Sequence, residues 1–175
     1  GGHGAKTSQH AVGSISNMTA SPDVTNTPTE NWDNGIARGG KVYFQDVGTS
    51  AGTLSVPTDL GPSITAAIGK GSFVQNYSFG AANNSYDSQA SFLDAALFSN
   101  PNFVVTVSAG NRGALGTGTL GSPSTAKNCI CVGGNDVASP DNLFINCSFN
   151  APSSCGSEDL GSSRGPVNGA GRIKP

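Results

Sequence analysis

The segment that decides the fold is Phe103-Val104-Val105-Thr106-Val107-Ser108-Ala109-Gly110-Asn111, an apolar run that ends in small residues and a carboxamide. Valine and threonine favour strands because their branched side chains pack well on a pleated surface. A strand that is apolar without alternation is typical of a parallel sheet covered on both faces. We therefore expect a buried strand over residues 102–107, with Ser108 to Asn111 directly beyond its carboxyl end.

Segments of helical and strand character alternate on both sides of this run. Apolar residues recur at helical spacing in three segments, residues 3–16, 58–70 and 87–99. Three further short segments are rich in strand-forming residues and bounded by turn residues, namely 41–47, 72–77 and 129–132. The alternation predicts right-handed crossovers and a mainly parallel sheet with helices on both faces, which is a three-layer α/β/α fold.

Composition bounds the possible functions. The 175 residues suffice for one domain with a sizeable core. A net charge of −2 gives no electrostatic case for nucleic acid as a partner. No apolar run approaches the roughly 20 residues that span a bilayer, so we expect no membrane span. The chain starts without a methionine and stops abruptly, so we interpret residues 1–175 as a piece of a larger protein whose targeting segment is not visible.

Two segments should meet at one edge of the predicted sheet. Ser78-Phe79-Gly80 follows the strand expected over 72–77, and Ser108 to Asn111 follows the next strand along the chain. Sites in parallel sheets collect at the carboxyl ends of the strands. An amide held there can donate to a developing negative charge, which is one requirement of an acyl-transfer site.

A second requirement is a base, and His3 is the candidate. It stands where the first predicted helix begins, a place that gives its imidazole a fixed direction. A neutral histidine with one ring nitrogen bonded to a carboxylate can accept a proton on the other. The plain alternative is an ordinary surface histidine.

In this order and spacing the chain resembles the subtilisin-like serine peptidases, the subtilase family. The resemblance rests on Gly2-His3-Gly4 with Gly13, on Ser78-Phe79-Gly80, and on Ser108-Ala109-Gly110-Asn111. It also rests on three longer runs of the family pattern, Ser122-Pro123-Ser124-Thr125-Ala126-Lys127-Asn128, Ser162-Ser163-Arg164-Gly165-Pro166 and Gly171-Arg172-Ile173-Lys174-Pro175. It covers nearly the whole chain and implies the subtilisin-type fold, with residues 1–175 forming part of a catalytic domain.

The resemblance also implies roles for individual residues. His3 would be the catalytic base, and Asn111 the side-chain donor to the oxyanion. The two walls of the main substrate pocket would be Ser78, Phe79 and Gly80 on one side and Ser108, Ala109 and Gly110 on the other. The nucleophilic serine, in a Gly-Thr-Ser-Met-Ala segment, and the orienting aspartate would lie outside residues 1–175, so we expect the fragment alone to be inactive. Peptides or proteins would be the substrates, and no cofactor is required. Calcium is common in the family, but no acidic cluster places a site.

Departures from the family pattern keep other functions open. Lys6 replaces the second histidine of the motif, Gln9 replaces a small residue, and Arg112 follows the oxyanion asparagine. Aligning His10 with the second histidine would leave Thr7 at the catalytic position, and we prefer the ungapped alignment. These departures motivate one alternative, an inactive pseudopeptidase or a secreted binding module.

A remote alternative is a dinucleotide-binding oxidoreductase. Gly116-Thr117-Gly118-Thr119-Leu120-Gly121 fits the G-x-G-x-x-G pattern after a strand. Such a site needs the glycine turn to open a helix that meets the pyrophosphate. Only residues 122–128 are available for that helix, with Pro123 inside them, so the pattern is weak evidence.

The cysteines and sequons point to a secretory route. Cys147 and Cys155 bracket a polar loop and are disulfide candidates. Cys129 and Cys131 alternate with apolar residues and are expected to be small core residues, with a four-cysteine zinc site the weaker reading. Asn-x-Ser/Thr sequons occur at Asn17, Asn76, Asn83 and Asn146.

Overall fold

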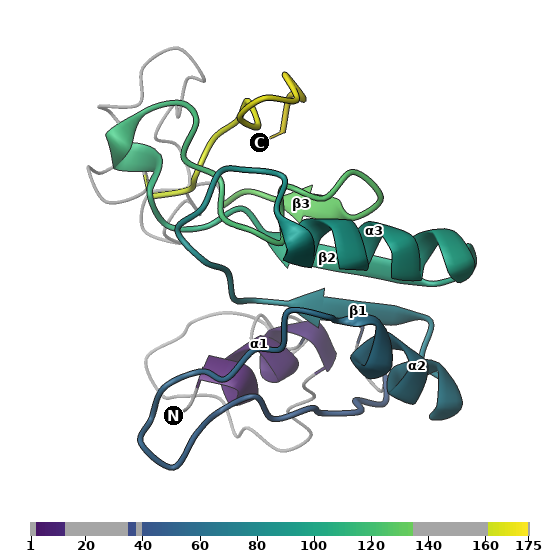
Figure 1. Ribbon diagram of the computed structural model, residues 1–175. Coiled ribbons are helices and arrows are strands. Elements are labelled where there is room, and N and C mark those ends of the chain that lie inside the picture. Colours follow the sequence, from purple (N-terminus) through teal and green to yellow (C-terminus); the bar gives the residue numbers. More distant parts are fainter. Residues whose placement is uncertain (1–2, 13–34, 38–39, 135–160, 175) are drawn as a thin grey trace, which may run out of the picture. The chain divides into compact units, whose positions relative to one another are not determined.

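The computed structural model describes residues 3–12, 35–37, 40–134 and 161–174 (Figure 1). The chain divides into two compact units, Gly1–Ser55 and Val56–Pro175, and each is described by itself. Cys147 and Cys155, and the sequons at Asn17 and Asn146, lie outside the described residues.

The first unit contains helix α1, His3–Val12, which confirms the helix expected at the start of the chain. The amides of Ile36 and Ala37 donate to carbonyls of its last turn, at 3.2 and 2.8 Å, and so close that end. The strand expected over residues 41–47 is wrong, because the described part of the unit shows no ladder there and only an antiparallel bridge between Gly48 and Leu54. Strand-forming residues make a strand only when a neighbouring strand satisfies their backbone groups.

The second unit is a three-stranded parallel sheet with helices. Strand β1, Val74–Tyr77, pairs with β2, Val104–Ser108, and β2 pairs with β3, Ile130–Val132, in the order β1-β2-β3. Helix α2, Gly61–Gly69, precedes β1, and helix α3, Ser88–Ser99, connects β1 to β2. A short 3-10 turn, η1 at Gly113–Leu115, follows β2. The predicted α/β class with a parallel sheet is confirmed.

Local signals set the helix ends. Asp87 precedes α3, and its carboxylate accepts a hydrogen bond from the Ala90 amide at 3.0 Å, an N-cap that satisfies one orphan donor of the first turn. Asn100 closes the other end through its backbone amide, before Pro101. In α2, Pro62 stands in the first turn, where its missing amide costs nothing.

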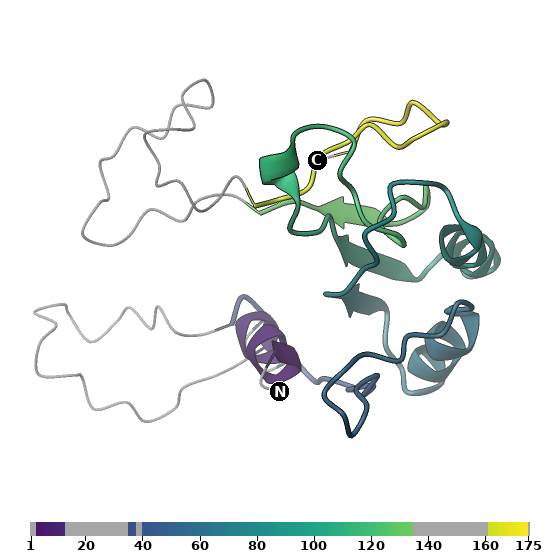
Figure 2. The same ribbon diagram turned by 60° about the vertical axis from the view of Figure 1, so that its left-hand side comes forward.

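One face of the sheet carries the core. Helices α2 and α3 lie on the same side of the three strands (Figure 2), and their apolar residues enclose Tyr77, Val105 and Val107. On the other face, Val74, Val104, Ile130 and Val132 are 40–57% exposed. Within the described part of this unit, α2 and α3 cover a single face of the sheet.

Candidate functional site

Two strand ends bring the sequence-predicted segments together. β1 and β2 are parallel, with Tyr77 opposite Val107, so both strands run out at the same edge of the sheet. Ser78-Phe79-Gly80 leaves that edge from β1, and Ala109-Gly110-Asn111 leaves it from β2. The Phe79 ring packs against Tyr77 with centroids 5.1 Å apart, which fixes the start of the first segment.

Gly121 and Ser122 form a floor that links these two segments. The Gly121 amide donates to the Ala109 carbonyl at 3.1 Å, and the Ala81 amide donates to the Ser122 carbonyl at 2.8 Å. A Cβ at Gly121 would lie 2.6 Å from the Ala81 carbonyl oxygen, so only glycine fits this position. In the sequence, Gly121 stands out only as the last glycine of the G-x-G-x-x-G pattern, so sequence reasoning misses its place between the two segments. The available signal was its place directly before the Ser-Pro motif.

Asp87 attaches this floor to helix α3. Besides capping the helix, its carboxylate accepts from the Ser122 hydroxyl at 2.6 Å and from the Asn83 side-chain amide at 2.9 Å. Both contacts are hydrogen bonds to an ionisable group, which are stronger than neutral ones. The floor is therefore held by the rigid helix rather than by loop residues alone.

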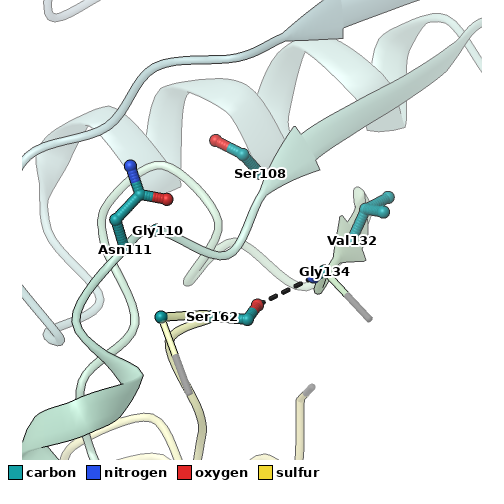
Figure 3. Close-up of a pocket in the computed structure, with 7 residues that line it drawn as sticks. Ser108, Gly110, Asn111, Val132, Gly134 and Ser162 are labelled. Carbon is teal, nitrogen blue, oxygen red and sulfur yellow. Dashed lines mark hydrogen bonds between the residues drawn. The ribbon is translucent and has the colours of Figure 1, made fainter. Parts of the chain in front are cut away.

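The Asn111 side chain is exposed and lies over a hollow at the carboxyl end of β2. The hollow is about 450 Å³ in volume and is lined by residues from three segments: Ser108, Gly110, Asn111, Val132, Gly134, Gly161 and Ser162 (Figure 3). Gly110 turns the chain here with φ +110°, a conformation that side-chain-bearing residues rarely adopt. Among the described residues, none accepts a hydrogen bond from the Asn111 carboxamide. It is a donor available to a ligand.

Arg112, next to Asn111, is engaged within the fold. Its guanidinium donates to the carbonyls of Thr119 and Leu120 at 3.0 and 2.9 Å. It does not line the hollow. These two hydrogen bonds of the guanidinium hold the loop that leads to Gly121 and so stabilise the floor.

His3 stands at the first position of α1, in the other unit. The sequence-predicted place of this residue at a helix start is thus confirmed, and its catalytic role stays a prediction. The other histidine, His10, is exposed on the same helix. Thr7, the catalytic position under the gapped alignment, bonds through its hydroxyl to the Gly4 carbonyl at 3.0 Å.

Neither described thiol is suited to act as a nucleophile. Cys129 is buried and Cys131 half-buried, and both are free. Burial raises the pKa of both thiols above the ordinary value, although the Lys174 ammonium, 3.7 Å from the Cys129 sulfur, opposes this shift. Because the thiolate is the reactive form, these residues are inert packing groups at neutral pH. The core role expected for Cys129 is confirmed.

The tripeptide Gly48-Thr49-Ser50 matches the first three residues of the nucleophile segment Gly-Thr-Ser-Met-Ala that the subtilase resemblance implies. It lies in an exposed turn of the first unit, where the Thr49 and Thr53 hydroxyls pair at 2.7 Å. The motif ends there, since Ala51-Gly52 replaces Met-Ala.

The described part of the chain offers neither a cluster of metal-ligating side chains nor a membrane-spanning helix. No group of three or more His, Cys, Asp or Glu side chains is placed to hold a metal ion there. Among the same residues, no helix is both long and apolar enough to cross a bilayer. The proposed disulfide between Cys147 and Cys155 falls outside this part and stays a prediction.

A three-stranded parallel sheet with helices, whose strand ends bring residues 78–80 and 109–111 to one edge, defines an α/β protein. The chain belongs to the subtilase family, whose family model matches residues 1–175. This family is one of serine peptidases. Its recognition from the sequence motifs is thereby confirmed.

Comparison with solved structures gives the "Structure of Prenylagaramide maturation protease PagA", at 19% identity and a TM-score of 0.43. The match covers 66% of this chain and 35% of that one, so the chain spans about a third of the length of that protein. A comparison with curated protein sequences finds no match.

The dinucleotide alternative fails on local structure. Residues 122–129, which follow the G-x-G-x-x-G pattern, contain turns and no α-helix. The pattern therefore lacks the helix N-terminus that would bind a pyrophosphate. Its last glycine, Gly121, instead lies between the segments that leave β1 and β2, where its amide donates to the Ala109 carbonyl.

Proposed function

We propose that the protein carrying this chain is a serine endopeptidase, in which His3 is the general base and Asn111 donates to the oxyanion. The nucleophilic serine and the orienting aspartate come from outside residues 1–175. Peptides or proteins are the substrates. Residues 1–175 alone are expected to hydrolyse nothing.

The observation that carries this proposal is the free Asn111 carboxamide at the carboxyl edge of the sheet. Within the Ser108–Asn111 segment, Asn111 has the one side chain with an uncharged NH₂ group, which can donate two hydrogen bonds. It stands next to a turn that only glycine adopts easily, which fixes the backbone from which it projects. A preorganised donor of this kind stabilises the charge of a tetrahedral intermediate without having to reorient.

In the proposed hydrolysis, each group of residues in this chain has its own role. His3 takes the proton of the attacking hydroxyl and returns it to the leaving amine. Asn111 donates to the carbonyl oxygen as it becomes negative. The backbones of residues 78–80 and 108–110 flank the side chain next to the cleaved bond, and the small residues among them let the substrate approach. Gly121 closes the floor between the two.

A fluorophosphonate probe tests the proposal, because it labels a serine only when a base activates it. In the intact protein that carries residues 1–175, we expect stoichiometric labelling of one serine outside this range. His3→Ala should abolish the labelling. Ser50→Ala, which removes the serine of the Gly48-Thr49-Ser50 tripeptide, should leave the labelling unchanged. Failure of the wild-type protein to react would refute the proposal in favour of the pseudopeptidase or binding module, and undiminished reaction of His3→Ala would refute the role of His3 as the base.

We also propose that the protein follows the secretory route, on the support of its sequons and the Cys147/Cys155 pair. In the structure, the side chain of Asn76 bonds the hydroxyls of Ser78 and Thr106. Asn83 is held by Asp87. A mass shift on enzymatic deglycosylation, confined to Asn17 and Asn146, is the expected result, whereas unmodified protein found only inside the cells would speak against the route.

A further inference from the structure

The segment that contains the Ser-Ser-Arg-Gly-Pro motif runs alongside the turn that carries Asn111. The Ser163 amide donates to the Gly110 carbonyl at 2.9 Å, and the Gly113 amide donates to the Gly161 carbonyl at 2.9 Å. Between these two backbone bonds, the Arg112 amide finds no carbonyl. It donates instead to the Ser163 side-chain oxygen at 3.0 Å.

Ser163 therefore holds the backbone on both sides of Asn111. Its amide binds the residue before Asn111, and its hydroxyl binds the residue after it. The side chain is completely buried. It also sits tightly behind the turn, because a Cβ on Gly110 would lie 2.8 Å from the Ser163 hydroxyl oxygen.

The neighbouring serine has a different task. The Ser162 hydroxyl accepts from the Gly134 amide at 2.9 Å, and Figure 3 shows it directed at Gly134 and away from Asn111. The two adjacent hydroxyls thus serve two different strand ends, β3 for Ser162 and β2 for Ser163. Only the second touches the turn of interest.

Nothing in the described part of the chain grips the Asn111 carboxamide itself, so its direction is set by the backbone on either side. A donor in an oxyanion site is effective only when it is held within a fraction of an ångström of the productive geometry. The two hydrogen bonds of Ser163, one to the Gly110 carbonyl and one from the Arg112 amide, form a clamp around Asn111 that supplies this restraint.

We propose that Ser163 is a positioning residue, whose hydroxyl acts through the Arg112 amide to hold the Asn111 carboxamide in its donating orientation. This inference rests on the proposed function for its catalytic consequence. The positioning itself is a property of the folded chain and can be measured without any turnover.

The kinetic test uses the intact protein and a chromogenic peptide substrate. Ser163→Ala should lower kcat roughly tenfold, part of the 10²- to 10³-fold loss typical of a missing oxyanion donor, with KM within about twofold. In an Asn111→Ala background, Ser163→Ala should have no further effect on kcat, because its route of action is gone. Equal losses in both backgrounds would overturn the proposal.

Tyr86→Phe is the matched control for a loss of stability. It also deletes one partly buried hydroxyl hydrogen bond, donated to Asp94 at 2.9 Å, and it touches no residue of the site. It should leave kcat unchanged. If Tyr86→Phe lowers kcat as much as Ser163→Ala does, the effect is one of general stability and the proposal is wrong.

The second measurement is independent of activity. In protein labelled with ¹⁵N-asparagine and ¹⁵N-arginine, Ser163→Ala should shift or broaden the Asn111 side-chain signals and speed hydrogen exchange of the Arg112 amide. Should that variant not fold, Gly110→Ala displaces the same hydroxyl and should give the same signature. Unaltered Asn111 signals in the folded variant would refute the positioning role, even in a protein that proves active. The expected shift in a protein that proves inactive would support the clamp and refute only the peptidase proposal.

Discussion

Replacing Gly110 by alanine measures how tightly the Asn111 turn is held against Ser163. Gly110 has φ +110°, where an L-residue is strained by about 1–3 kcal/mol. The added methyl group would also lie 2.8 Å from the Ser163 hydroxyl oxygen. Relief of that contact moves the hydroxyl away from the Arg112 amide, and an unsatisfied buried amide costs about 1–3 kcal/mol. We expect Gly110→Ala to lower the free energy of unfolding by about 2–6 kcal/mol.

Gly116→Ala is the matched control. Gly116 has a similar φ of +96°, but a Cβ there would meet nothing within 4 Å. This variant should show the conformational strain alone, about 1–3 kcal/mol. The difference between the two variants isolates the contact with Ser163.

The assay is urea unfolding followed by far-UV circular dichroism, with comparison restricted to variants whose m-values agree. A double-mutant cycle completes it. In a Ser163→Ala background the nearest atom to the added methyl is Cβ at 3.5 Å, an ordinary contact, so Gly110→Ala should cost about 1–3 kcal/mol less than in the wild type. Equal costs for Gly110→Ala and Gly116→Ala, or a strictly additive cycle, would refute the tight packing on which the clamp depends.

Three further predictions concern the frame around the site. Gly121→Ala, which directs a methyl group at a backbone oxygen 2.6 Å away, should unfold the chain at lower urea than any variant above, and a wild-type midpoint would contradict the floor. Tyr86→Phe should cost about 1.5–3 kcal/mol in the same assay, and almost nothing in an Asp94→Ala background, because the hydroxyl donates to that buried carboxylate. Burial raises the pKa of the Cys129 and Cys131 thiols in the folded chain, so the unfolded chain loses these protons at lower pH. The free energy of unfolding is therefore retained below the ordinary thiol pKa and falls as the pH rises above it. A Cys129→Ala, Cys131→Ala double variant should lack that part of the decline.

The features that the sequence predicts well are those with local causes. Helix α3 was predicted nearly to the residue, because Asp87 caps it and Asn100-Pro101 ends it. The strand ends that carry Ser78 and Asn111 follow from the strand-forming residues before them, which are aromatic or β-branched. Parallel pairing then brings those ends to one edge without further information.

The features that the sequence does not reveal depend on partners distant along the chain. Residues 41–47 have strand-forming side chains but no ladder among the described residues, and no local pattern reports a missing partner. The clamp at Ser163 joins residues 51 positions apart, so its hydroxyl reads in the sequence as part of a structural motif only. Gly121 reads as loop glycine until the Ala81 carbonyl is found against it.

The most direct test of the central claim is the turnover of Asn111→Ala in the intact protein, measured under substrate saturation against the wild type. The proposed oxyanion role predicts a fall in kcat of about 10²- to 10³-fold with KM nearly unchanged. A kcat within twofold of the wild-type value, in a variant that unfolds at the wild-type urea concentration, would show that this carboxamide takes no part in the reaction.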